Sequence, residues 1–125
     1  QNAQQLINDA TPDINEIFGR VCGNPQYDRL QIEARIQRAN IVYSFKALPE
    51  QLVLGDVAAA VLSGGNQSVA SIAAMMALAA GGTHNFNSLV LDDPCSDMDA
   101  DTRARWCESA SEFARGRQFI VFTHL

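Results

Sequence analysis

Ser88-Leu89-Val90-Leu91-Asp92-Asp93-Pro94 is the stretch that decides the fold of this 125-residue chain. Its apolar run ends abruptly in two carboxylates and a proline, which is typical of a strand buried on both faces. The carboxyl end of such a strand is where an open α/β sheet carries its functional side chains. Two acids are costly there unless a cation compensates them, and Mg²⁺ prefers oxygen ligands. The stretch indicates either a nucleotide–Mg²⁺ site or a simple turn before Pro94.

Length and composition are those of one domain, or of one lobe of a larger domain. Hydrophobic residues make up 47% of the chain, and the net charge of −5 favours neither a general nucleic-acid surface nor a membrane surface. The three cysteines show no CxxC spacing, so we expect neither disulfides nor a zinc site in a reduced, cytoplasmic protein. Both ends of the sequence look cut, and we expect the chain to be a piece of a longer protein.

The first third of the chain predicts a helix followed by a β-hairpin. Residues 1–9 have weak helical character, and Thr11-Pro12 is typical of a helix N-cap and first position, with Gly23 as the C-cap. Helical spacing predicts one apolar face made of Ile14, Ile17, Phe18 and Val21. Alternation then predicts a half-buried strand whose inward residues are Leu30, Ile32, Ala34 and Ile36. Residues 37–40 can turn the chain into a second strand at 41–45, and 48–61 form a connection.

A Ser-Gly-Gly turn at residues 63–65 precedes a segment, 68–80, that is almost entirely apolar or small and predicts a helix buried nearly all round. Free backbone N–H groups converge at a helix N-terminus, and glycines there let a phosphate approach the backbone. The alternative is a glycine-rich N-cap with no ligand.

An acidic loop, Ser96-Asp97-Met98-Asp99, follows the opening strand and leads into a predicted helix at 100–115, capped by Asp99 or Asp101 and ended by Gly116. Its expected inward residues are Trp106, Ala110, Phe113 and Ala114, and those expected to face water are Arg103, Arg105, Glu108 and Glu112. A last apolar strand, 119–122, delivers His124, which is either functional or structural.

The order of these features resembles the C-terminal half of an ABC-type ATPase head over residues 62–125. In that superfamily LSGG is the signature motif, the apolar strand with its acids is Walker B, S-x-x-D is the D-loop, and the histidine is the H-loop. A helix and hairpin ahead of the signature resemble the SMC-like or SbcC-like branch, which acts in DNA repair and chromosome maintenance. The implied fold is an α/β lobe with parallel core strands, flanking helices and an N-terminal β-hairpin. Residues 1–23 would re-enter from a coiled coil, and 24–125 would form the lobe.

The resemblance implies ATP and Mg²⁺ as ligands and assigns roles to matched positions. Asp92 would hold Mg²⁺, Asp93 would activate the attacking water, and His124 would contact the γ-phosphate. Asp99 would couple two sites across a dimer. The residues expected to meet the ATP of the opposite subunit are Ser63, Gly64, Gly65 and Asn66. Asp93 departs from the usual Glu, and Asn66 stands where Gln is common.

No GxxxxGK[ST] occurs in the chain, so the Walker A lobe would have to come from elsewhere. The resemblance implies as partners that N-terminal lobe, a second head, DNA, and a nuclease or accessory subunit, with no membrane. This chain alone would be inactive. Two alternatives remain: the nucleotide-binding lobe of an ABC transporter, and a non-catalytic ABC-like interaction domain.

Overall fold

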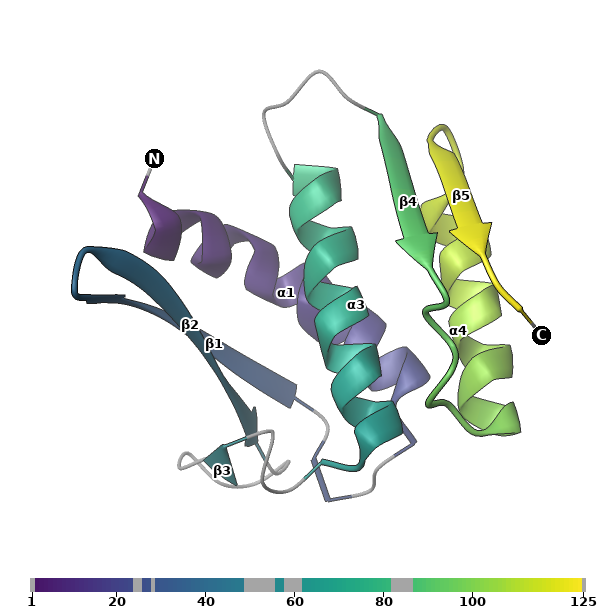
Figure 1. Cartoon of the computed structure of the whole chain (residues 1–125), viewed down its shortest axis with the longest axis horizontal. Helices are drawn as coiled ribbons and strands as arrows, with labels where there is room; N and C mark the ends of the chain where they lie inside the picture. The colour runs from purple at the N-terminus through teal and green to yellow at the C-terminus, as the bar shows by residue number, and fades with distance from the viewer. Residues whose placement is uncertain are drawn as a thin grey trace.

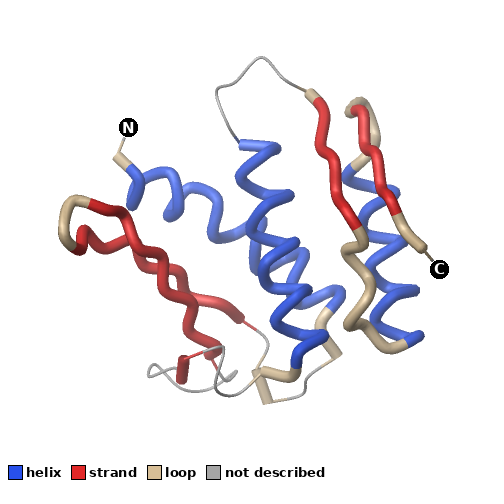
Figure 2. Tube along the Cα trace, viewed as in Figure 1, coloured by secondary structure: helices blue, strands red, loops and turns tan. Residues whose placement is uncertain are grey.

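The computed structural model describes residues 2–23, 26–27, 29–48, 56–57, 62–81 and 87–124. The elements follow one another as α1 (Ala3–Val21), β1 (Arg29–Gln37), β2 (Asn40–Leu48), β3 (Asp56–Val57), α3 (Gly64–Gly81), β4 (Ser88–Asp92), α4 (Ala100–Phe113) and β5 (Gln118–Phe122). The antiparallel sheet β1-β2-β3 and the parallel pair β4-β5 lie on opposite sides of α1 and α3 (Figures 1 and 2). Most of the connection predicted over 48–61 lies outside the described residues.

The core forms where α1 packs against α3 and β1. Its largest fully buried side chains come from these three elements and are Phe18, Ile14, Leu30, Met76, Val21 and Val69. Small residues on α3 allow this close packing, since Ala70, Ala73 and Ala77 are all buried. The prediction that α3 is buried nearly all round holds apart from a stripe in which Ser71 and Met75 are exposed.

Helix α1 is continuous, so the N-cap predicted at Thr11 is wrong. Asn2 caps the helix by accepting a hydrogen bond from the Gln5 amide, and Pro12 lies inside it. The Thr11 hydroxyl donates to the Ile7 carbonyl 2.7 Å away, which is the bond that a threonine inside a helix makes to the preceding turn. The predicted inward face is confirmed at Ile14, Phe18 and Val21 and extends back to Ile7 and Ala10. The helix ends at extended Cys22, not at a Gly23 cap.

The predicted hairpin is confirmed, and a two-residue turn joins its strands. Arg38 and Ala39 both have positive φ (49° and 65°), as a turn that matches the right-handed twist of a hairpin requires. Leu30 and Ile32 are buried, but Ile36 is 83% exposed, so its predicted inward position is wrong. The hairpin extends beyond the helices that cover its base, and its distal end has no cover among the described residues (Figure 1).

The parallel pair β4-β5 is covered on one face, so the prediction that the opening strand is buried on both faces is wrong for this chain. Phe119 packs against Trp106 and Phe113 of α4, with ring centroids 6.4 and 5.7 Å apart. Val90, Ile120 and Phe122 are exposed. Parallel strands usually have helices on both faces. The open face therefore presents an apolar surface that another element would cover.

Helix α4 ends two residues earlier than predicted, and two of its arginines do not face water. Arg105 is half-buried and donates from Nε to the Val21 carbonyl at 3.1 Å, while Arg103 donates to the Met98 carbonyl at 3.2 Å. Trp106 and Ala110 are buried as predicted, and Glu108 and Glu112 are exposed. Within the described parts of the chain, no helix has the length and apolar character needed to cross a bilayer.

Candidate functional site

Asp93 and His124 meet at the carboxyl end of the parallel pair. Asp92 is aligned with Phe122 in the sheet register, so the residues that follow the two strands leave the sheet at the same edge. The Asp93 amide donates to the Phe122 carbonyl at 2.7 Å. The Asp93 Oδ2 atom lies 3.0 Å from His124 Nδ1. Two residues predicted for the site from separate motifs are therefore in direct contact.

The backbone of Asp93 is held in an unusual conformation. Its φ of +47° lies in the left-handed region, which aspartate tolerates better than most residues. The loop stabilises this geometry, because the Asp93 carbonyl accepts from the Ser96 amide at 3.4 Å. Strain of this kind persists where the surrounding structure over-determines it, often at functional positions.

The other carboxylate oxygen of Asp93, Oδ1, is buried and has no hydrogen-bond partner among the residues that the structure describes. A buried acceptor without a partner is costly, and such an atom is normally satisfied by water, an ion or a ligand. The imidazole on the opposite oxygen is 79% exposed, so it remains accessible to another molecule. Asp93 thus has one oxygen engaged by histidine and one that lacks a partner.

Asp92 is exposed at the end of β4. Among the described residues no three or more His, Cys, Asp or Glu side chains gather in a way that could hold a metal ion. A protein cage for a cation is therefore not present in this part of the chain. Mg²⁺ is commonly held by one or two carboxylates together with phosphate oxygens and water, and a single exposed aspartate suits that arrangement.

Ser63 closes the first turn of α3, and the two glycines that follow it differ in their surroundings. The Ser63 hydroxyl accepts from the Asn66 amide at 3.3 Å, and its carbonyl accepts from the Gln67 amide at 2.9 Å. A Cβ added at Gly64 would meet nothing within 4 Å. A Cβ added at Gly65 would lie 2.6 Å from the Asp97 carbonyl oxygen. Gly65 is therefore needed for packing inside this chain, and only Gly64 leaves the backbone open to another molecule.

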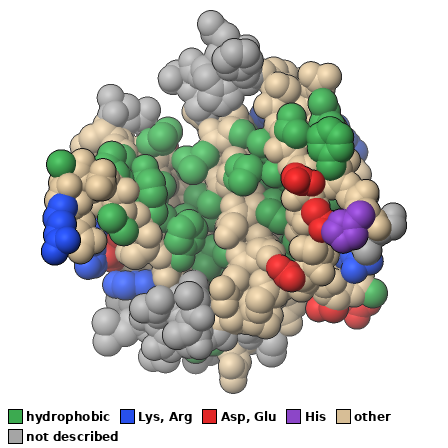
Figure 3. Space-filling model, viewed as in Figure 1, with side chains coloured by type: hydrophobic (Ala, Val, Ile, Leu, Met, Phe, Trp, Pro, Cys, Tyr) green, Lys and Arg blue, Asp and Glu red, His purple; other side chains and the backbone are tan. Residues whose placement is uncertain are grey.

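The start of α3 and the loop after β4 share one groove of about 440 Å³. Its walls carry Gly64, Gln67 and Ser68 on the helix side and Asp93, Ser96 and Asp97 on the loop side. Two motifs separated along the sequence by the whole of α3 therefore face the same space. Acidic side chains gather near the histidine on this side of the molecule (Figure 3).

Asp99 is the N-cap of α4, as predicted. Its two oxygens accept from the Thr102 amide at 2.8 Å and the Thr102 hydroxyl at 3.0 Å. These two hydrogen bonds, with a smaller contribution from the charge of Arg105, hold the pKa of the Asp99 carboxyl below its ordinary value. Since both oxygens are engaged within the chain, any contact of Asp99 across a dimer would have to share or replace the cap.

Sequence reasoning missed the structural role of Arg105. Its guanidinium donates hydrogen bonds to the last turn of α1 and to the Thr102 hydroxyl, so it links the end of α1 to the residue that is hydrogen-bonded to the N-cap Asp99. A Cβ added at Gly23 would lie 2.7 Å from this guanidinium. An arginine within an amphipathic pattern gives no signal of such a link, because the pattern predicts only that the side chain lies near the helix surface.

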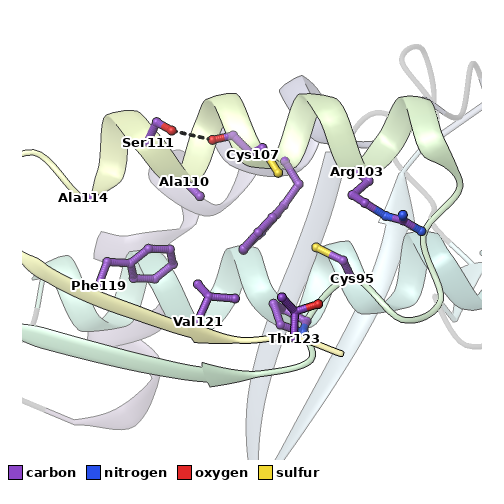
Figure 4. Close-up of a pocket in the computed structure, with 11 residues that line it drawn as sticks. Cys95, Arg103, Cys107, Ala110, Ser111, Ala114, Phe119, Val121 and Thr123 are labelled. Atoms are coloured by element: carbon purple, nitrogen blue, oxygen red, sulfur yellow. Dashed lines mark hydrogen bonds between the residues drawn. The ribbon is translucent and has the colours of Figure 1, made fainter. Parts of the chain in front are cut away.

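A second groove, mainly apolar and of about 420 Å³, runs between α4 and β5 (Figure 4). Phe119 and Val121 point from β5 toward α4, Cys107 lies on α4, and Cys95 and Thr123 line the end of the groove from the segments that follow β4 and β5. Burial raises the pKa of the Cys95 thiol. None of these residues was predicted to form a site.

No family model and no curated protein sequence matches this chain. Solved structures match it in fold. An SMC ATPase studied for ATP-driven dimerization and DNA-stimulated activation superposes over 98% of this chain and 71% of its own length, with a TM-score of 0.72 and 17% identity. A Smc head bound to the C-winged helix domain of ScpA gives a TM-score of 0.70 at 19% identity over 97% of this chain. The SMC head domain of Thermotoga maritima gives 0.53 at 24% identity, again over 97%.

These matches confirm the predicted fold, which is that of the C-terminal lobe of an SMC-like ATPase head. This chain spans 36% and 41% of the last two structures, so it corresponds to only part of those heads. At such low identity the likeness establishes the architecture, and the chemistry has to be argued from the residues of this chain.

Proposed function

We propose that this lobe forms half of an ATP-hydrolysing head, which binds ATP–Mg²⁺ together with an N-terminal Walker A lobe and dimerises around the nucleotide. The observation that carries the proposal is the contact between Asp93 and His124 at the carboxyl end of the parallel pair, with the unpartnered Asp93 Oδ1 atom beside it. Solved structures with this fold include an SMC ATPase with ATP-driven dimerization, which supports the same assignment.

In the proposed mechanism Asp93 orients a water and accepts its proton as the water attacks the terminal phosphate. Asp93 Oδ1 is the oxygen without a partner among the described residues, since Oδ2 is engaged by His124 Nδ1, and the loop after β4 would have to expose this buried atom to the water in the complete head. With Nδ1 donating to the carboxylate, Nε2 is left for another partner, and it donates to a phosphate oxygen when the ring is protonated. Aspartate is one methylene shorter than the usual glutamate, and the contact with His124 would help to hold the shorter carboxylate of Asp93 in place.

Asp92 fits the position of a Mg²⁺ ligand, since it is exposed at the strand end and no second cage residue is needed when phosphate and water complete the coordination. Bound Mg²⁺ would neutralise charge on the phosphates during transfer. Gly64 would let the backbone amides at the start of α3 approach a phosphate held by the opposite head, with Ser63 and Asn66 beside it. Gly65 would act indirectly by allowing the Asp97 loop to pack.

The apolar face of β4-β5 supports the proposed N-terminal partner. Val90 and Phe122 are more than half exposed there, at 55% and 58%. A parallel sheet with one bare face is incomplete, and further strands and helices of an N-terminal lobe would cover it. Without that lobe this chain would bind ATP poorly and hydrolyse none. Coupling of the complete head to DNA repair, chromosome organisation or defence, and to a nuclease or accessory subunit, is part of the same proposal.

The test is an ATPase assay on this chain co-expressed with its Walker A lobe. We expect Asp93→Asn and His124→Ala each to lower kcat by about 10²- to 10⁴-fold, the usual contribution of a positioned general base or acid. Asp101→Asn is the matched control, because Asp101 is an exposed acid in the first turn of α4. Retained hydrolysis in the first two variants, with unchanged folding, would refute their roles.

A further inference from the structure

The hairpin β1-β2 carries a charge opposite to that of the rest of the molecule. Residues 29–48 contain four of the nine Lys and Arg residues and one of the fourteen Asp and Glu residues. This ribbon therefore has a net charge of +3, and the remainder of the chain has −8. The total of −5 conceals this separation, which sequence analysis overlooked. The Lys and Arg side chains of the ribbon lie on the opposite side of the view from the histidine and the acids around it (Figure 3).

The strand register places these cations on one face of the ribbon. Directly opposed pairs share a face, and one face consists of Leu30–Ala47, Ile32–Phe45, Ala34–Tyr43 and Ile36–Ile41. The base of that face is buried in the core. The other face, hereafter the basic face, carries Arg29, Gln31, Glu33, Arg35, Gln37, Asn40, Val42, Ser44, Lys46 and Leu48, with Arg38 in the turn at its end. Most of these side chains are hydrogen-bond donors.

The single acid of the basic face does not neutralise it. Glu33 is shared between Arg35 and Lys46, with 3.3 Å between its Oε1 atom and Lys46 Nζ. Two cations around one carboxylate leave an excess of one positive charge. Arg35 is 68% exposed in its side chain, and Arg38 is exposed in the turn. The excess charge is therefore available to a partner in solution.

We propose that the basic face of the β1-β2 ribbon binds the phosphate backbone of duplex DNA. A row of cations and neutral donors with one shared acid matches a polyanion whose charges repeat at short, regular intervals. A two-stranded ribbon also fits the width of the B-DNA major groove, and the turn at Arg38-Ala39 is the end of the ribbon that would enter the groove first. This deepens the proposed function by assigning a surface to its DNA partner, and it requires no nucleotide.

The test is fluorescence anisotropy of a labelled 20-base-pair duplex titrated with the chain, without ATP, over a series of salt concentrations. Three to four neutralised phosphates predict a slope of log K against log salt of about −2.7 to −3.6, so the affinity falls by about 40- to 150-fold between 50 and 200 mM salt. Replacing Arg35 and Arg38 together by Gln should weaken binding at least about tenfold at 50 mM salt and reduce the slope by about 2.

Two further variants make the test specific. Arg115→Gln with Arg117→Gln removes the same charge from the turn between α4 and β5, and this pair, the α4 pair, should leave the affinity within about twofold of the parent if binding is local. Glu33→Gln frees two cations at once and should tighten binding several-fold, a gain that misfolding cannot produce.

The outcomes separate this proposal from its rivals. Absence of binding at 50 mM salt would overturn it, as would equal losses from the ribbon pair and the α4 pair. A parallel titration with vesicles containing 30% phosphatidylserine tests for a membrane surface, and binding tighter than to the duplex would also overturn it. Since the assay contains no ATP, its failure leaves the ATPase proposal standing, and a failed ATPase test leaves the DNA measurement unaffected.

Discussion

The two glycines at the start of α3 should respond oppositely to the same substitution. In Gly65→Ala the new methyl would lie 2.6 Å from the Asp97 carbonyl oxygen, closer than the 3.0 Å below which real contacts essentially do not occur. The opposing group is backbone, so the loop itself has to move by at least about 0.4 Å. Overpacking of this kind costs about 1–3 kcal/mol, offset by up to about 1 kcal/mol of helix propensity gained on replacing glycine.

The net expectation for Gly65→Ala is a loss of about 1–2 kcal/mol in the free energy of unfolding. Gly64→Ala meets nothing within 4 Å and should be neutral or stabilising by up to about 1 kcal/mol. Urea unfolding followed by circular dichroism measures both variants, and a stability difference of about 1–3 kcal/mol should separate the two midpoints by about 0.5–2 M. In the complete head Gly64→Ala should still weaken ATP-dependent dimerisation. Equal stability of the two variants would refute the packing argument.

Three further predictions concern a cap, an edge and the thiols. Asp99→Asn keeps an N-cap but removes its charge. Since the pKa of Asp99 in the folded chain lies below the ordinary 3.8, the parent should be more stable than the variant above pH 3.8, and this difference should disappear as the pH falls through the folded pKa. Unfolding measured from pH 2 to 7 would show it. Asn15→Ala removes both side-chain hydrogen bonds to the Leu30 backbone (2.6 and 3.1 Å) and should lower the free energy of unfolding by about 1–3 kcal/mol. Glu16→Ala changes an exposed residue of the same helix and should not. Equal unfolding midpoints for the two variants would contradict this. Iodoacetamide should label exposed Cys107 at least about tenfold faster than Cys95, because Cys95 is only 6% exposed and the pKa of its thiol is raised. Peptide mass spectrometry would measure both rates. Comparable rates would argue against the burial of Cys95.

Local patterns were sufficient where neighbours in the chain decide the outcome. The hairpin and the helix after the acidic loop follow from side-chain alternation and helical spacing, and the Asp99 cap follows from a polar residue at a helix start. The start of α1 was misplaced because Thr11-Pro12 is a strong N-terminal signal. A threonine inside a helix can instead bond its hydroxyl to the preceding turn, as Thr11 does with Ile7, and the sequence does not distinguish the two cases.

The sequence by itself determined the order of the motifs, because strand ends and helix starts are local features, and its resemblance to ATPase heads predicted the lobe fold. The residues that would carry its chemistry stay a prediction. Only the tertiary structure decided how these residues are arranged. Parallel pairing brings Asp93 and His124 to within 3.0 Å, and packing of the Asp97 loop separates the role of Gly65 from that of Gly64. The strand register gathers the cations of a net acidic chain on one face of a ribbon. The first two depend on contacts between segments distant in the chain, which no local pattern records, and the third depends on the exact pairing of two neighbouring strands.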